Sequence, residues 1–219
     1  MRSFPFSALV LSLSLSAAPA IAASDMSFRL TSVGDPARCG DKCAKAIVAE
    51  GEIGDSTVRD FVDFVRRNIP DRSVRAVVFL HSPGGKVHAS MALGRAFRAV
   101  RAAVVVARPL GEGQGFAAGS CFSACVYALM GGVKRVTPQG SRIGVHRMYM
   151  YESGNDPAGG GGQRRRFDDG GMRDVLARYS ASMGVSSDLI AYAERTPSEA
   201  ILMLNPKDIA RWRLAAPNF

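Results

Sequence analysis

Ser123 and His146 are the two residues of this chain whose types suggest a chemical reaction. Ser123 stands among small residues before an apolar stretch, and His146 follows the short apolar segment 143–145. A serine hydroxyl becomes a nucleophile when an imidazole takes its proton. The pair therefore predicts acyl transfer, with Ser123 attacking a carbonyl and His146 acting as general base. Each residue taken alone also has a structural explanation, since serines often cap helices and histidines often have structural roles.

A Ser-Pro-Gly-Gly turn at 82–85 could complete such a site. It follows an apolar run and precedes a helical pattern, and its glycines permit backbone conformations that other residues avoid. Backbone N–H groups of such a turn, with the N–H that follows a nucleophile at a helix start, can hold an oxyanion. A nucleotide site fits poorly, because the G-K-[ST] and G-x-G-x-x-G patterns are missing. A plain strand–helix turn is the simpler alternative.

The chain has 219 residues, of which 47% are hydrophobic, and a net charge of +9. This length supports one sizeable domain. The charge could attract anionic lipid, envelope polymer or acidic peptides, but most arginines are scattered, which favours a general compositional bias. Arg164, Arg165 and Arg166 are the exception and stand beside four glycines. We expect a mobile surface loop at 154–171, with binding of an anionic partner or covering of a cleft as alternatives.

Residues 1–22 have the pattern of a secretory signal peptide. A single Arg2 precedes an apolar run, and an A-x-A motif ends at Ala22. We expect cleavage near Ala22, leaving residues 23–219 as a single domain in the periplasm. The apolar run is short for a membrane span, so a retained anchor is the less favoured alternative. No later stretch is long enough to cross a bilayer.

The four cysteines form two pairs, each four residues apart. Cys39 and Cys43 lie in a turn-like stretch, and we expect a disulfide between them in an oxidising compartment. Cys121 and Cys125 stand at and just after the start of a predicted helix, where this spacing rarely suits a disulfide, so buried free thiols are expected and a bridge is the alternative. A bridge there would be expected to distort the helix that presents Ser123. No metal site is predicted, because only three histidines are present.

Helical and strand patterns alternate along the chain. Apolar runs predict strands at 27–31, 46–53, 74–80, 102–107, 135–137 and 143–146. Helical spacing predicts helices at 55–69, 87–100, 122–129, 172–183, 186–195 and 206–212. A Gly-rich loop is expected at 111–119. Strands that are apolar on both faces and alternate with helices predict an α/β fold with mostly parallel strands.

The order of these motifs resembles the ClpP fold of serine peptidases, within the ClpP/crotonase superfamily. The resemblance rests on the SPGG turn, on Ser123 before an apolar helix, and on the motifs GG-x-x-R at 131–135 and S-R-I-G-V-H at 141–146. It spans about residues 46–214 and is closest to exported, ClpP-like envelope proteins of bacteria, which carry a signal peptide and a C-x-S-A-C segment. It implies repeated ββα layers, Ser123 as nucleophile, His146 as base, and an oxyanion hole formed by the N–H groups of Gly85 and Ala124.

The resemblance also implies a third, acidic member of a triad just before the last helix. An ungapped comparison places Ile201 at that position. Glu199 stands two residues away and is the candidate for the third member, with Glu194 and Asp188 as alternatives. A triad without its orienting acid loses much of its activity.

The sequence thus predicts an exported serine hydrolase, a peptidase acting on peptides or unfolded proteins, without a cofactor and without a nucleic-acid partner. Members of the family form rings, so the resemblance implies a homo-oligomer. The main alternative is a ClpP-fold envelope protein that binds without catalysis. A crotonase-like acyl-CoA enzyme fits poorly with export. A Ser–Lys dyad would need Lys134, and a thiol nucleophile would need Cys121 or Cys125.

Overall fold

The computed structural model describes residues 24–69, 76–111, 115–153, 163–167 and 170–219. The signal peptide predicted at 1–22 lies outside the described residues. In the described part of the chain we find no helix with the length and apolar character that a membrane span requires.

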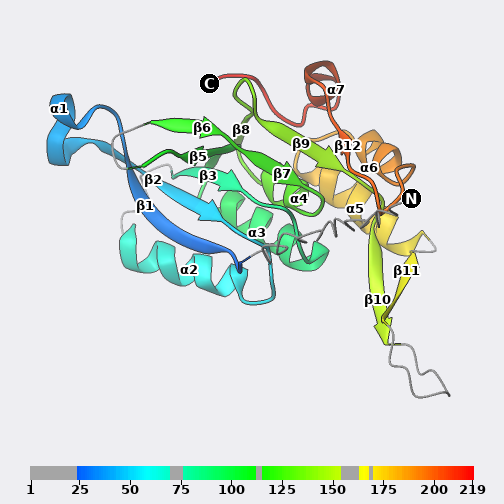
Figure 1. Ribbon diagram of the computed structural model, residues 1–219. Helices are drawn as coiled ribbons and strands as arrows, with labels where there is room; N and C mark the ends of the chain where they lie inside the picture. Colours follow the sequence, from blue (N-terminus) through cyan, green and yellow to red (C-terminus); the bar gives the residue numbers. More distant parts are fainter. Residues whose placement is uncertain (1–23, 70–75, 112–114, 154–162, 168–169) are drawn as a thin grey trace, which may run out of the picture.

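A five-stranded sheet forms the centre of the fold (Figure 1). Its strands, in order across the sheet, are β1 (Ser27–Val33), β2 (Ala44–Glu50), β3 (Val77–His81), β4 (Ala103–Val105) and β8 (Lys134–Val136). The β1–β2 pair is antiparallel, and every other neighbouring pair is parallel. The prediction of an α/β fold with mostly parallel strands is therefore confirmed. The apolar runs of β3 and β4 are explained by burial on both faces of the sheet.

Helices cover one face of this sheet. They include α2 (Thr57–Asn68) and α3 (Val87–Ala99), whose Phe61 and Phe97 rings meet edge to face with centroids 5.0 Å apart. Both rings are completely buried against alternate residues of β2, β3 and β4. This packing explains the helical spacing of apolar residues in the two segments.

The other face of the sheet is covered by a short hairpin of β5 (Ala107–Pro109) and β6 (Phe116–Ala118). The prediction of a loop throughout 111–119 is therefore wrong for 116–118, which form β6. Phe116 stacks on Phe79 of β3, with ring centroids 3.8 Å apart. That partner belongs to a distant part of the sequence, so no local pattern could indicate the strand.

A second sheet carries β7 (Ser120–Phe122), β9 (Arg142–Val145) and β12 (Leu202–Met203), in the order β12-β9-β7. β7 and β9 are parallel, and β12 is antiparallel to β9. Ser82, just after β3, forms a parallel bridge with Cys121 of β7. This bridge joins the two sheets two residues before Ser123.

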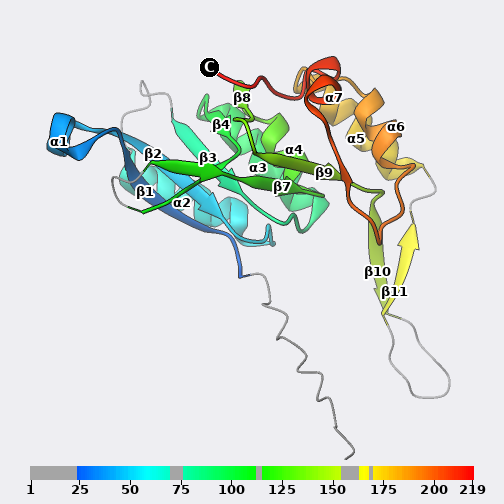
Figure 2. The ribbon, with the colours of Figure 1, turned by 45° about the horizontal axis from the view of Figure 1, so that its top comes forward.

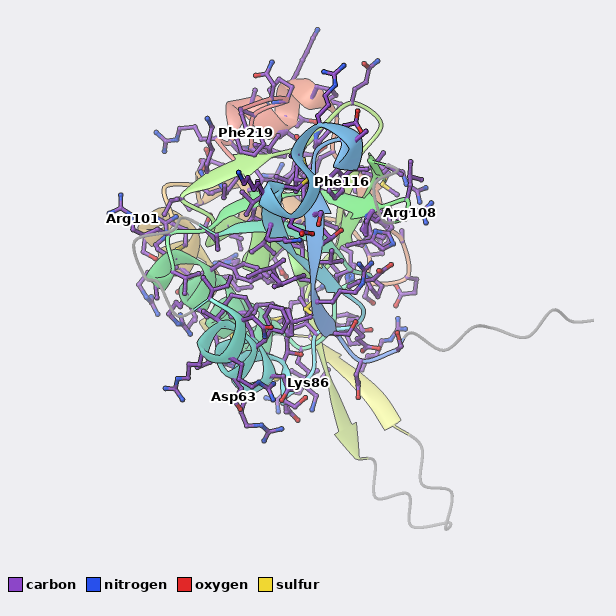
Figure 3. All side chains as sticks on the ribbon, turned by 90° about the vertical axis from the view of Figure 1, so that its left-hand side faces the viewer. Asp63, Lys86, Arg101, Arg108, Phe116 and Phe219 are labelled. Atoms are coloured by element: carbon purple, nitrogen blue, oxygen red, sulfur yellow. A yellow bond between two sulfur atoms is a disulfide. The ribbon has the colours of Figure 1, made fainter. Side chains whose placement is uncertain are left out.

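The C-terminal part contains α5 (Gly171–Ser182), α6 (Asp188–Ala193), α7 (Pro206–Arg211) and a hairpin of β10 (Tyr149–Ser153) and β11 (Gln163–Phe167). The hairpin projects from the body in both ribbon views (Figures 1 and 2). The prediction of a loop at 154–171 is therefore wrong for 163–167, where Arg165 and Arg166 lie in a strand. Elsewhere the basic side chains are spread, and Arg101 and Arg108 point outward on opposite sides of the body (Figure 3).

The GG-x-x-R motif fixes the helix α4 (Cys125–Met130) that follows Ser123. A Cβ at Gly131 would lie 1.9 Å from the carbonyl oxygen of Gly94, so α3 and α4 approach as closely as only glycine allows. Arg98 and Arg135 both donate hydrogen bonds to the carbonyl oxygens of Met130, Gly132 and Met183. Burial, and then the charge of Arg98, lowers the pKa of Arg135. The arginines cap the end of α4 and hold it against α5.

Candidate active site

Three strand ends meet at the candidate site. β3 runs into the Ser-Pro-Gly-Gly turn, β7 into Ser123, and β9 into His146. The bridge between Ser82 and Cys121 and the β7–β9 ladder are both parallel, so the carboxyl ends of the three strands lie on the same side. In α/β sheets, ligands bind at the carboxyl ends of parallel strands. Ser123, the glycine turn and His146 are therefore brought together by topology.

Ser123 occupies a tight turn between β7 and α4. Its φ is +55°, in the left-handed region that residues other than glycine seldom adopt. The backbone N–H donates to the carbonyl oxygen of Gly144 at 2.8 Å, which fixes the turn to β9. Such a conformation costs about 1–2 kcal/mol and is typical of functional sites. It also explains why the predicted helix 122–129 begins later, at Cys125, with Phe122 in β7.

A disulfide spans this turn, joining Cys121 of β7 to Cys125 of α4. Of the two alternatives left by the sequence, the structure has the bridge and not the expected free thiols. The reason is that Cys121 lies in a strand and only Cys125 is helical, so the two Cα atoms are 5.3 Å apart. The bridge links the two elements on either side of Ser123 and leaves α4 regular. Cys39 and Cys43 form the other disulfide. Cys39 ends α1 (Pro36–Cys39), which lies at the end of the body remote from α6 (Figure 1).

We expect the double substitution Cys121→Ala/Cys125→Ala to reduce the reactivity of Ser123 by about 10-fold or more, because the strained turn loses its covalent restraint. The measurement is the rate of labelling by a fluorophosphonate probe. Cys39→Ala/Cys43→Ala is the matched control, since it removes a disulfide of the same sequence separation away from the site. Equal rates for the two double variants would contradict the expectation.

The glycine turn packs directly on Ser123. Ser82 is fully buried, and its hydroxyl accepts a hydrogen bond from the N–H of Gly84 at 3.1 Å. Gly84 has φ +116°, and a Cβ there would lie 2.7 Å from the Phe122 carbonyl oxygen and 2.9 Å from Cβ of Ser123. Glycine is required at this position by both its conformation and the space available.

Two backbone N–H groups, one in the glycine turn and one at the start of α4, are the candidates for an oxyanion hole. Among the residues that the structure describes, neither the N–H of Gly85 nor that of Ala124 donates a hydrogen bond. The position of a Cβ on Gly84 would be 3.2 Å from the nitrogen of Ala124, so the turn and the start of α4 adjoin. Free donors next to a nucleophile are what an oxyanion hole needs.

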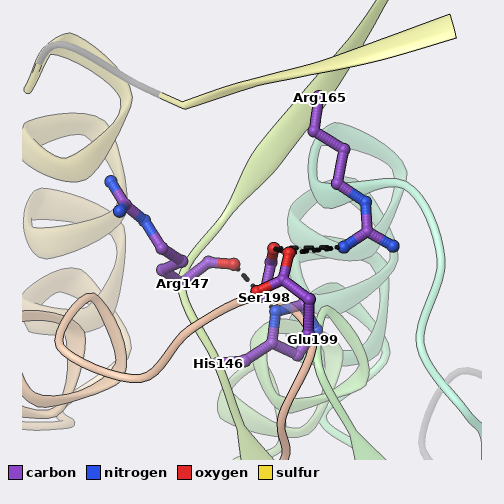
Figure 4. Close-up of polar contacts among 5 residues, drawn as sticks. All are labelled: His146, Arg147, Arg165, Ser198 and Glu199. Atoms are coloured by element: carbon purple, nitrogen blue, oxygen red, sulfur yellow. Dashed lines mark hydrogen bonds and ion pairs between the residues drawn. The ribbon is translucent and has the colours of Figure 1, made fainter.

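His146 follows β9, with its Nδ1 2.8 Å from the carbonyl oxygen of Arg147 (Figure 4). A carbonyl oxygen only accepts, so Nδ1 carries the hydrogen, and Nε2 of the neutral ring is left as a proton acceptor. Ser123 and His146 line one small cavity. No hydrogen bond joins their side chains within the described part of the chain, as is common in unliganded sites.

The candidate acids lie in other interactions. The Glu199 carboxylate accepts hydrogen bonds from Ser198 at 2.6 Å and from Arg165 of β11 at 2.8 Å (Figure 4). The Ser198 bond chiefly, with further hydrogen bonds that include that from Arg165, lowers the pKa of Glu199. Glu194 accepts the backbone N–H of Met148 at 3.1 Å, and Asp188 is exposed at the start of α6.

The segment that carries Glu199 nevertheless passes close to His146. The N–H of Arg147 donates to the carbonyl oxygen of Thr196 at 2.8 Å, and Leu202 pairs with Val145. Residues 197–201 therefore cross beside His146. The carbonyl of Arg147, which sequence reasoning missed, takes the place expected for a carboxylate. Nothing in a residue type marks such a role, because every residue has a carbonyl.

His81, at the end of β3, links two of the strands that carry the candidate site. Its Nδ1 accepts the N–H of Ser120 at 2.9 Å, so this atom must be unprotonated and β3 is tied to β7. Burial is the main cause that lowers the pKa of His81; the charge of Glu50 opposes it, and the charges of Arg108 and Arg142 add smaller effects that lower the pKa.

We expect this histidine to make the fold sensitive to acid. The pKa of His81 in the folded chain is below 6.5, the ordinary value that applies to the unfolded chain. At a pH between these two pKa values, the unfolded chain binds more protons than the folded chain. The free energy of unfolding therefore falls as the pH drops below about 6.5. Urea unfolding from pH 7.5 to pH 5 measures this. In His81→Asn an amide oxygen can accept the same N–H without titrating, and the slope should shrink. An unchanged slope would contradict the expectation.

Comparisons with known proteins place the fold. The 1510-N membrane-bound stomatin-specific protease, as a serine-to-alanine mutant, matches with a TM-score of 0.53 and 17% identity over 75% of this chain and 73% of the protease. A lysine-to-alanine mutant of it, in complex with a substrate peptide, matches with a TM-score of 0.53 and 18% identity over 75% and 69%. The chain has the ClpP/crotonase-type fold.

Other comparisons add little to this. The catalytic domain of the ClpP protease from Plasmodium falciparum matches with a TM-score of 0.48 and 14% identity over 75% of this chain and 78% of that domain. No protein-family model matches the sequence, and no curated protein matches it. The two matches to the stomatin-specific protease confirm the fold predicted from the sequence. A fold alone does not determine function.

Proposed function

We propose that this protein is a serine peptidase whose catalytic groups are Ser123 and His146. The observation that carries the proposal is the turn of Ser123. A serine held at φ +55°, beside two backbone N–H groups without acceptors and sharing a cavity with a histidine whose Nε2 is left as an acceptor, has what acyl transfer requires. Two solved structures that share the fold are mutants of a stomatin-specific protease, and one of them is in complex with a substrate peptide.

In the proposed reaction, the Ser123 oxygen attacks the peptide carbonyl carbon and transfers its proton to Nε2 of His146. The carbonyl oxygen becomes an oxyanion held by the N–H groups of Gly85 and Ala124. The bond from carbon to nitrogen then breaks, and the leaving amine takes the proton from His146. Water, deprotonated by the same imidazole, hydrolyses the acyl-enzyme and restores Ser123. The Arg147 carbonyl holds the tautomer throughout and stabilises the imidazolium.

We propose that the reaction takes place outside the cytoplasm. Disulfides persist in oxidising compartments, and this chain has two, one of them across the turn of Ser123. The apolar N-terminal segment predicted as a signal peptide agrees with export to the periplasm. Peptides or unfolded proteins are the proposed substrates, and self-association remains a prediction.

Labelling with a fluorophosphonate probe tests the proposal. The Ser123 oxygen forms a bond to phosphorus and fluoride leaves, so the label marks an activated serine. We expect wild type to be labelled and both Ser123→Ala and His146→Ala to lose the label. Ser120→Ala, three residues earlier in β7, is the matched serine control and should be labelled normally. Circular dichroism establishes that each variant is folded.

The alternative function is binding without catalysis. It is favoured by one observation, that the described residues offer His146 a carbonyl and no carboxylate as its partner. Under this alternative, folded wild type stays unlabelled at concentrations of probe that label a control serine hydrolase completely.

A further inference from the structure

A small cavity lies directly against Ser123 and His146. Its volume of about 10 Å³ has room for about one water molecule. Apolar side chains of α4, β9 and α6 form the wall, among them Tyr127, Met130, Val145, Leu189, Ile190 and Ala193. A second, larger cavity of about 340 Å³ lies between α6 and α7, and neither Ser123 nor His146 lines it.

The wall of the small cavity is firmly held. Met130 is fully buried, and Leu189 and Ile190 are each 1% exposed. The carbonyl of Met130 accepts hydrogen bonds from Arg98 and Arg135, which fixes the end of α4. Protein interiors are packed like organic crystals, and forcing extra methylene groups into them costs about 1–3 kcal/mol. The cavity therefore cannot widen cheaply around a large side chain.

A substrate carbonyl attacked by Ser123 brings one side chain to this cavity. The carbonyl oxygen must point to the N–H groups of Gly85 and Ala124, and the leaving group must face His146. The side chain of the residue that supplies the carbonyl then lies within a few ångströms of Ser123. Ser123 and His146 themselves line the small cavity, so it adjoins that place, and no Asp, Glu, Lys or Arg side chain lines it.

We propose that this cavity selects substrates in which the residue on the acyl side of the cleaved bond is alanine, or the similarly small glycine or serine. The proposal rests on the proposed peptidase function and concerns its specificity. A methyl group fits in the space of one water molecule, whereas a leucine or phenylalanine side chain meets the wall. Met130, Leu189 and Ile190 are the residues that set this limit.

Peptidyl diphenyl phosphonates that differ only in one side chain test the selectivity directly. The Ser123 oxygen bonds to phosphorus, and phenoxide leaves with the proton from His146. We expect the alanine analogue to label folded wild type about 100-fold faster than the leucine or phenylalanine analogue. Equal rates, or faster labelling by the large analogues, would overturn the proposal.

A matched pair of variants connects the selectivity with the wall. Leu189→Ala enlarges the cavity, and we expect the ratio of alanine to leucine rates to fall to about 10 or less. Leu176→Ala removes an equally buried leucine of α5 outside the wall and should keep the wild-type ratio. If Leu189→Ala does not fold, Ile190→Val makes a milder change in the same wall, and the ratio should still fall.

The outcomes for the function and for its specificity are separate. Labelling by all analogues at one rate would leave the peptidase standing and refute the small-residue selectivity. A ratio that stays the same in the cavity variants would also refute it. Folded wild type that reacts with no analogue and with no fluorophosphonate would refute both.

Discussion

Replacing His146 by alanine should lower the rate of hydrolysis by about 10⁴-fold or more, because the Ser123 hydroxyl then has no base to take its proton. Replacing Glu199 by glutamine should change the rate by less than about 3-fold, because the partner of His146 Nδ1 is the Arg147 carbonyl. The Glu199 carboxylate is exposed and paired with Arg165 of the projecting hairpin. Steady-state hydrolysis of a peptide substrate by the two variants measures the contrast.

The contrast decides what orients the imidazole. The loss of a true orienting carboxylate costs up to about 10⁴-fold in a serine protease. A loss of that size in Glu199→Gln would show that Glu199 leaves Arg165 and acts on His146 during catalysis. Arg165→Met is the matching test, because it frees Glu199 from its ion pair. If Glu199 acts on His146 during catalysis, this variant should change the rate of hydrolysis.

Replacing Gly84 by alanine should reduce the labelling of Ser123 by about 100-fold or more. The new Cβ would lie 2.9 Å from Cβ of Ser123 and 2.7 Å from the Phe122 carbonyl oxygen, so either the glycine turn or the turn of Ser123 must move. A displacement of about 1 Å is enough for an effect of this size. The φ of +116° adds a loss of stability, because an alanine avoids it. Labelling rate and urea unfolding measure the two effects.

Gly170→Ala separates the steric effect from the conformational one. Gly170 has nearly the same φ, +119°, but a Cβ there meets nothing within 4 Å among the described residues. We expect this variant to lose stability without losing the label. A similar loss of labelling in both variants would mean that the clash with Ser123 is not what matters.

Local patterns in the sequence predicted the parts of the fold that depend on burial alone. The apolar run of β3 and the helical spacing of α2 each report which side of an element faces the core, and both elements form close to the predicted residues. The Ser-Pro-Gly-Gly turn and the order of Ser123 and His146 were equally visible, because motifs at strand ends depend on short stretches of chain. The patterns were enough to predict the α/β class, and the resemblance of the motifs to the ClpP family implied the fold.

Tertiary structure decided the features that depend on partners distant in sequence. β6 forms because Phe116 stacks on Phe79, and β11 forms because 163–167 pair with β10. The disulfide across Ser123 exists because β7 extends to Phe122, which removes Cys121 from the helix.

The polar partners of the site also depend on residues that are distant in sequence. Glu199 is paired with Arg165, and a backbone carbonyl serves His146, because the β9–β12 pairing and the β10–β11 hairpin bring these groups together. The sequence by itself therefore determined which elements form and which residues could react. The contacts between elements determined which of those residues meet, since a local pattern records burial but not the identity of the neighbour.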